Sequence, residues 1–94
     1  MGNLVGLPGV KGGKIENVPF ARSVTGAMKA LKKSRAVTGA GSYGAWTVWQ
    51  ADDSEYRCDF SRYMVTKSKA SYTTKAKVYQ WLKTWLPQAE TRPA

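Results

Sequence analysis

The sequence predicts a small single α+β domain, in which a two- or three-stranded antiparallel sheet packs with an N-terminal and a C-terminal helix. Apolar residues recur at helical spacing toward both ends of the chain and alternate with polar residues between them. With 94 residues, of which 43% are hydrophobic, the chain can build one core but is too short for two domains.

We expect a flexible N-terminal arm over residues 1–16, one folded domain over 17–87 and a frayed tail over 88–94. The arm contains five glycines and one proline, a composition typical of flexible segments. Its lysines could follow a phosphate backbone, although chain termini are loose in most proteins without serving any partner.

The first helix is expected from about Pro19 to Lys33, with Asn17 as its cap. One side of this helix is apolar, and Gly26 weakens it by about 1 kcal/mol relative to Ala. The apolar side comprises Phe20, Val24, Ala27, Met28 and Leu31, and the opposite side is cationic, with Arg22, Lys29, Lys32 and Lys33. Such a face can bind phosphates, lie on an anionic membrane or simply be solvated.

The strongest strand signals lie on either side of an acidic turn at Asp52–Ser54. They cover Tyr43–Ala51 and about Glu55–Val65, which together predict a hairpin. One face of the hairpin is apolar, with Trp46, Val48, Tyr56, Cys58 and Phe60, and the other carries Thr47, Trp49, Arg57, Asp59, Ser61 and Tyr63. Trp49 and Tyr63 are either exposed there or packed under the first helix.

Residues 39–44 match the glycine spacing of dinucleotide sites, but such a motif must follow a strand and open a helix. Here it follows a helical segment and leads into a strand, so we interpret it as a loop.

The stretch Thr66–Ser71 is either a loop or a bent strand, and Ala70–Thr73 can form a short third strand. The last helix begins after Thr73 or Thr74 and ends at Pro87, with one apolar side made by Val78, Trp81, Leu82, Trp85 and Leu86.

The charge balance points to a polyanionic partner. The chain has fifteen Lys and Arg residues and six Asp and Glu residues, which give a formal net charge of +9. This charge favours nucleic acid as the partner. Charge that serves only solubility is the alternative. A small inhibitor or adaptor that recognises an acidic partner protein would show the same composition.

Catalysis is not expected, because the chain has no His for proton transfer and no Ser-His or Cys-His pairing. Cys58 stands alone on the apolar face, which indicates a buried, inert thiol and no disulfide. No cofactor or metal is expected, and no membrane partner, because no apolar run approaches the roughly 18 to 20 residues of a membrane span. These features, and the lack of an export signal, predict a cytoplasmic protein.

Residues 43–86 combine an aromatic residue in a strand, an acidic turn, a basic residue in the next strand, an aromatic-Thr-Lys entry to a helix and a Trp-Leu pair within it. These features are Trp46, the Asp52-Asp53 turn, Arg57, Tyr72-Thr74-Lys75 and Trp81-Leu82. In them the chain resembles the AP2-like DNA-binding domains of phage and transposon integrases. It implies that a sheet reads the DNA major groove with its exposed face while a helix packs on the other, and that the protein is a stand-alone accessory factor of a phage or mobile element.

We therefore predict a non-catalytic protein that binds nucleic acid, most simply double-stranded DNA, with DNA or RNA preference and oligomeric state left open. Lysines would hold phosphates, and side chains of the hairpin would face bases or grooves. The phosphate contacts are Lys29, Lys32, Lys33, Lys67, Lys69, Lys75 and Lys77, and the groove contacts are Thr47, Trp49, Arg57 and Arg62.

Overall fold

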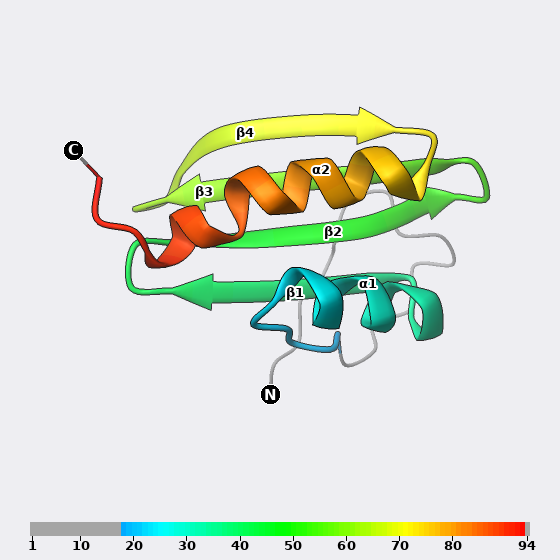
Figure 1. The fold of residues 1–94 in the computed structure, drawn as a ribbon. Helices are drawn as coiled ribbons and strands as arrows, with labels where there is room; N and C mark the ends of the chain where they lie inside the picture. Colours follow the sequence, from blue (N-terminus) through cyan, green and yellow to red (C-terminus); the bar gives the residue numbers. More distant parts are fainter. Residues whose placement is uncertain (1–17, 94) are drawn as a thin grey trace.

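The computed structural model describes residues 18–93, and in this part of the chain a helix, a four-stranded sheet and a second helix follow one another (Figure 1). The expected arm over residues 1–16 and the Asn17 cap lie outside the described residues. The elements are α1 (Val24–Lys33), β1 (Ala36–Gly41), β2 (Gly44–Asp52), β3 (Glu55–Arg62), β4 (Val65–Tyr72), α2 (Lys75–Trp85) and the 3-10 helix η1 (Pro87–Glu90).

The α+β class and the antiparallel sheet are confirmed, but the sheet has four strands instead of two or three. The strands pair in chain order, β1-β2-β3-β4, and each neighbouring pair is antiparallel. The strands beyond the predicted hairpin are the outer ones, β1 and β4, and β4 includes most of the short third strand that Ala70–Thr73 could form. Both consist largely of small or polar residues, so neither shows the apolar alternation by which a strand is recognised in a sequence.

The glycine-rich stretch expected to be a loop instead forms the end of β1 and its turn into β2. Gly39 pairs with Trp46, and a side chain at this glycine would collide with the Trp46 indole. A side chain at Gly41 would likewise collide with the backbone of Ala89. The glycines thus allow close contact between neighbours and serve no phosphate loop.

β4 occupies the stretch for which the sequence left a loop and a bent strand as alternatives. It pairs with β3 along its whole length, from Arg62 opposite Val65 to Tyr56 opposite Tyr72, with an irregularity at Phe60 and Ser61. The side chains of β4 are mostly exposed, so backbone hydrogen bonds to β3 hold the strand in place more than burial does.

α1 begins later than expected, at Val24, because the hydroxyl of Ser23 accepts a hydrogen bond of 3.0 Å from the Gly26 amide and caps the helix. The preceding residues run extended beside β1, where the Ala21 amide donates to the Thr38 carbonyl. Phe20 consequently lies outside the helix and is 54% exposed, although the sequence placed it on the apolar side.

Both helices lie over the same face of the sheet (Figure 1). The expected apolar sides point inward: Ala27 and Leu31 of α1 are buried, as are Val78, Trp81 and Leu82 of α2, whose cap is Thr74. They enclose a core with the inward residues of the sheet, chiefly Val37, Trp46, Val48, Tyr56, Cys58 and Phe60. The other face of the sheet therefore remains free of both helices.

The chain after α2 turns into η1 and packs against the sheet, an element the sequence did not predict. Ala89 in η1 is only 2% exposed, and its carbonyl accepts a hydrogen bond of 2.8 Å from the Tyr43 amide at the β1–β2 turn. η1 thereby closes the end of the core beside that turn.

Candidate nucleic-acid interface

The residues predicted to contact nucleic acid divide between two faces of the domain. The helix lysines project from the layer formed by α1 and α2, whereas Thr47, Trp49, Arg57 and Lys69 lie on the face of the sheet that the helices leave free. The sequence did not separate these groups, because their separation depends on both helices packing on the same side.

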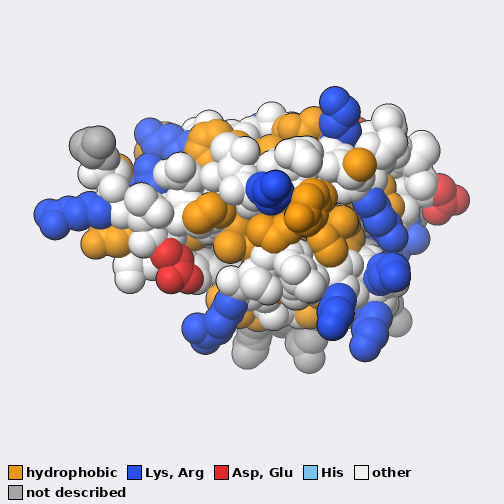
Figure 2. All heavy atoms as spheres, in the orientation of Figure 1, with side chains coloured by type: hydrophobic (Ala, Val, Ile, Leu, Met, Phe, Trp, Pro, Cys, Tyr) orange, Lys and Arg blue, Asp and Glu red, His pale blue; other side chains and the backbone are white. Residues whose placement is uncertain are grey.

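The helix layer presents cationic side chains without acidic neighbours in either helix. Neither α1 nor α2 contains Asp or Glu. The lysines of the two helices are all exposed, and they are Lys29, Lys32, Lys33, Lys75, Lys77 and Lys83. Figure 2 shows basic side chains spread over this face, with acidic ones near its edges. We call these six residues the helix-lysine surface.

None of the helix lysines is drawn into an ion pair with another described residue. The two ion pairs recorded between residues 18 and 93 join Arg35 to Asp53 at 4.0 Å and Arg57 to Glu55 at 3.3 Å. Lys83 contacts the Tyr79 ring, with its Nζ 5.4 Å from the ring centroid. The positive charge of this surface is therefore available to an external anion.

The sheet face carries a mixture of charges around a hollow of about 490 Å³. Thr47, Asp59 and Lys69 form one row across β2, β3 and β4, and Trp49, Arg57 and Ser71 form the next. These six residues line the hollow together with Ala45, Cys58, Ser61 and Ala70. Lys67 lies further along β4, exposed to solvent.

Arg57 on this face is already paired. Its guanidinium approaches Glu55 through Nε at 3.3 Å and Nη2 at 3.4 Å, and Glu55 also accepts a hydrogen bond of 3.0 Å from the Ser71 hydroxyl. The pair is half-exposed, so it can open at little cost, but the neighbouring carboxylates of Glu55 and Asp59 reduce the attraction of this face for phosphate.

Trp49 is on the predicted face of the sheet but is buried, with 4% of its surface exposed. It pairs with Arg57 and with Ala36 on the neighbouring strands, and its side chain lies on the side of the sheet away from α1. The first helix therefore does not cover Trp49, which was one of the two alternatives from the sequence. Its indole Nε1 is buried and has no hydrogen-bond partner among residues 18–93. A role in base contact would require this side chain to become accessible.

Arg62 holds three segments of the chain together. Its Nε donates to the Tyr43 carbonyl at 2.9 Å, and its Nη2 donates to the carbonyls of Gln88 at 2.9 Å and Thr91 at 3.4 Å. The guanidinium also lies 5.6 Å from the centroid of the Phe60 ring. These contacts give Arg62 a structural role, and the predicted groove contact would have to compete with them.

The turn between β3 and β4 is a feature that the sequence analysis missed. Tyr63 and Met64, expected inside the second strand, are the two turn residues and have φ values of +52° and +67°. Two-residue hairpin turns of this kind favour Asn-Gly, because other side chains strain the backbone, at about 1–3 kcal/mol each. Tyr63, Met64 and the following Val65 are exposed by 68%, 98% and 53%.

Cys58 is fully buried between β2 and β4, and this burial raises the pKa of its thiol from 9.0 to about 12. A protonated, inaccessible thiol is neither a nucleophile nor a metal ligand at neutral pH.

Within residues 18–93 no group of three or more His, Cys, Asp or Glu side chains could hold a metal ion. Neither helix in this part of the chain is long and apolar enough to cross a membrane.

Comparison with known proteins finds no matching family, no matching curated sequence and no matching solved structure.

Proposed function

We propose that the protein binds nucleic acid without catalysis, most simply double-stranded DNA, and that the helix-lysine surface holds the phosphates. The observation that carries the proposal is the concentration of six exposed lysines on two adjacent helices that contain no acidic residue. Charge kept only for solubility is best served when basic and acidic groups alternate, and these helices have no such alternation.

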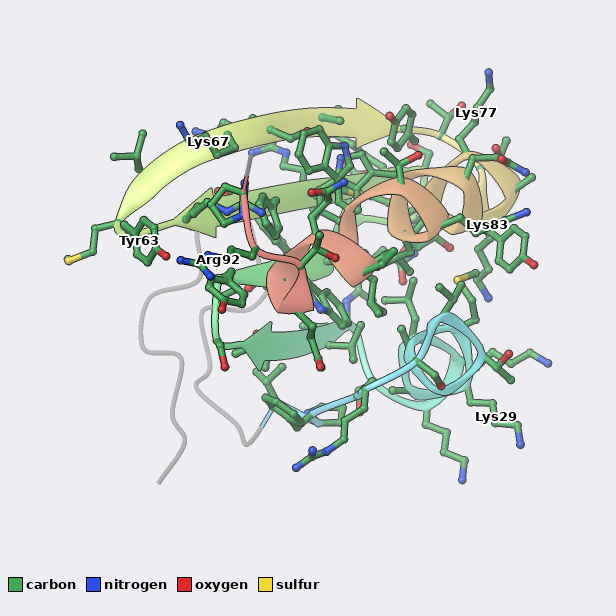
Figure 3. The ribbon with its side chains drawn as sticks, turned by 60° about the vertical axis from the view of Figure 1, so that its left-hand side comes forward. Lys29, Tyr63, Lys67, Lys77, Lys83 and Arg92 are labelled. Atoms are coloured by element: carbon green, nitrogen blue, oxygen red, sulfur yellow. The ribbon has the colours of Figure 1, made fainter. Side chains whose placement is uncertain are left out.

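The dimensions of the domain suit a duplex. Its longest dimension is 39 Å, slightly more than one turn of B-DNA, which is about 34–36 Å. Figure 3 shows Lys29, Lys77 and Lys83 toward one end of the molecule, from two different helices. Lysines on neighbouring helices can reach phosphates on both sides of a groove.

The sheet face is the second part of the proposed interface, as the resemblance to AP2-like domains implies. Groove and phosphate contacts would be made by side chains on this face or at its β4 edge, namely Thr47, Arg57, Lys67 and Lys69. Because this face is opposite the helix layer, one straight duplex cannot cover both. The more uniformly basic helix-lysine surface is the better candidate for the dominant electrostatic contact.

Binding alone is proposed because the chain has no His and its single Cys is buried and protonated. A lone reduced thiol also suits a cytoplasmic protein. A role as an accessory factor of a phage or mobile element would be consistent with such a binder, and it rests on the AP2-like resemblance alone.

The test is fluorescence anisotropy of the protein with labelled duplex DNA, single-stranded DNA and double-stranded RNA, across about 50 to 200 mM salt. Each neutralised duplex phosphate contributes about −0.9 to the slope of log affinity against log salt, so a slope of about −4 or steeper is expected. Absence of binding at the lowest salt would refute the proposal and would favour an acidic partner protein as the ligand.

A further inference from the structure

The end of the β3–β4 hairpin exposes three apolar side chains in succession. Tyr63, Met64 and Val65, which we call the hairpin tip, are exposed by 68%, 98% and 53%. We propose that the hairpin tip acts as a wedge that inserts Met64, supported by Tyr63, between adjacent base pairs of duplex DNA from the minor groove. This inference rests on the proposed function and assigns a site that the proposed lysine contacts do not include.

The backbone of the hairpin tip indicates that its side chains serve a purpose other than forming the turn. Both turn residues have positive φ, +52° at Tyr63 and +67° at Met64, and these are the only two non-glycine residues with positive φ in the described part of the chain. Asn-Gly would form the same turn without strain. Strained positions that persist in a fold tend to lie at functional sites.

The hairpin tip is also held rigidly from behind, as a wedge must be. Arg62, the residue before the turn, bonds the carbonyls of Tyr43, Gln88 and Thr91, and it pairs with Val65 across the hairpin. The tip is thereby fixed to the β1–β2 turn and to the segment after α2. Because the backbone of the tip is already fixed, only its side chains lose conformational freedom on insertion.

The surroundings of the hairpin tip favour a polyanion over an apolar partner. Lys67 and Arg92 lie toward the same end of the molecule as Tyr63, whereas Lys29, Lys77 and Lys83 lie toward the other (Figure 3). Apolar side chains such as Met, flanked by basic residues, are the usual means by which proteins unstack a base step from the minor groove.

The decisive variant is the double substitution Tyr63→Asn with Met64→Gly. It removes the wedge but supplies the preferred turn sequence, so the fold should be retained and Tm should rise by about 5 °C or more. The probe is a short fluorescein-labelled duplex with 2-aminopurine at a central TA step, a step that unstacks easily. Anisotropy of this sample reports binding, and 2-aminopurine emission reports unstacking.

With the wild-type protein we expect anisotropy to rise and 2-aminopurine emission to increase about twofold as the base step opens. With the double variant we expect binding within about threefold of wild type and no increase in emission, because the helix lysines remain. Lys67→Gln in the wild-type hairpin is the matched control, and it should weaken binding while leaving the emission increase at saturation intact.

Wild-type binding without an emission increase would overturn the wedge while leaving the proposed function standing. Equal emission increases for wild type and double variant would overturn it as well. If anisotropy does not rise for wild type, the proposed function itself fails. Sedimentation of wild type, but not of the double variant, with phosphatidylserine vesicles would assign the hairpin tip to a lipid surface and overturn the proposal.

Discussion

The indole Nε1 of Trp81 donates a hydrogen bond of 3.0 Å to the hydroxyl of Ser68. This contact joins α2 to β4, the outermost strand of the sheet. Trp81 is only 4% exposed, so its N–H has little access to water. The bond therefore fixes the end of the sheet that has the fewest contacts with the helices.

Ser68→Ala is expected to lower the free energy of unfolding by about 1–2 kcal/mol, because it leaves the Trp81 N–H buried without a partner. Urea denaturation followed by Trp fluorescence measures the change. Ser71→Ala is the control: it makes the same change on the same strand, but its hydroxyl bonds Glu55 at the surface, and a change within about 0.5 kcal/mol is expected. Equal effects of the two substitutions would contradict the assigned role of Ser68.

Gly39→Ala is expected to destabilise the protein by about 1–3 kcal/mol, because the added methyl group would collide with the Trp46 indole and separate β1 from β2. Thermal unfolding followed by circular dichroism measures the loss. Ala40→Ser, at the next and exposed position of β1, should change stability by less than about 0.5 kcal/mol. A neutral Gly39→Ala would show that β1 does not pack on Trp46 in this way.

The two candidate surfaces can be compared by variants of equal charge. The helix variant removes three positive charges from the helix layer by replacing Lys29, Lys32 and Lys33 with Gln. The sheet variant removes three from the sheet side by replacing Arg57, Lys67 and Lys69 with Gln. Each variant lowers the formal charge from +9 to +6. We expect the helix variant to reduce the salt slope of duplex binding by about 2.7, from three contacts at about 0.9 each.

The sheet variant is expected to change the slope by less than about 1 and to affect sequence preference more than affinity for random duplex. The two variants share the same net charge, so any difference between them reflects the location of the charges. A larger slope change in the sheet variant would transfer the main phosphate contacts to the sheet side, as in the AP2-like arrangement.

Arg62→Lys is expected to lower the free energy of unfolding by about 1–3 kcal/mol, because a lysine cannot reach three carbonyls with a fixed fork of donors. Duplex affinity of the folded variant, measured by anisotropy below its unfolding temperature, should stay within about twofold of wild type. A stable variant with greatly weakened binding would instead favour the groove contact predicted from the sequence.

Cys58 should resist thiol reagents in the folded protein. Its pKa is raised to about 12 by burial, so at pH 8 the thiol is protonated as well as inaccessible. Labelling with a chromogenic disulfide should become fast only in urea that unfolds the chain. Rapid labelling in native buffer would contradict the buried position between β2 and β4.

The same pKa shift has a consequence for stability at high pH. The folded-state pKa lies above the ordinary value of 9.0, so the folded chain retains a proton that the unfolded chain gives up. The stabilisation from Cys58 is fully present below pH 9 and is lost progressively as pH rises toward 12. Cys58→Ala should remove this part of the pH dependence, measured as the difference in urea midpoint between the two proteins across that range.

The sequence determined the parts of the fold that depend on local periodicity. The apolar sides of α1 and α2 and the alternation of β2 and β3 follow from residue spacing, because one face of each element must be buried. For the cap of α2 the sequence left Thr73 and Thr74 as alternatives, and the structure has Thr74. The charge of +9 and the absence of His are likewise properties of the sequence, and they direct the functional proposal toward binding.

The outer strands, the separation of the two faces and the β3–β4 turn depend on how the elements pack together. β1 and β4 form by hairpin pairing with the strand next to each along the chain, and their small and polar residues carry no local signal of it. The packing of both helices on one side separates the helix lysines from Arg57 and Lys69. Pairing of Arg62 with Val65 places Tyr63 and Met64 at positive φ, because the register of β3 and β4 leaves two residues to reverse the chain.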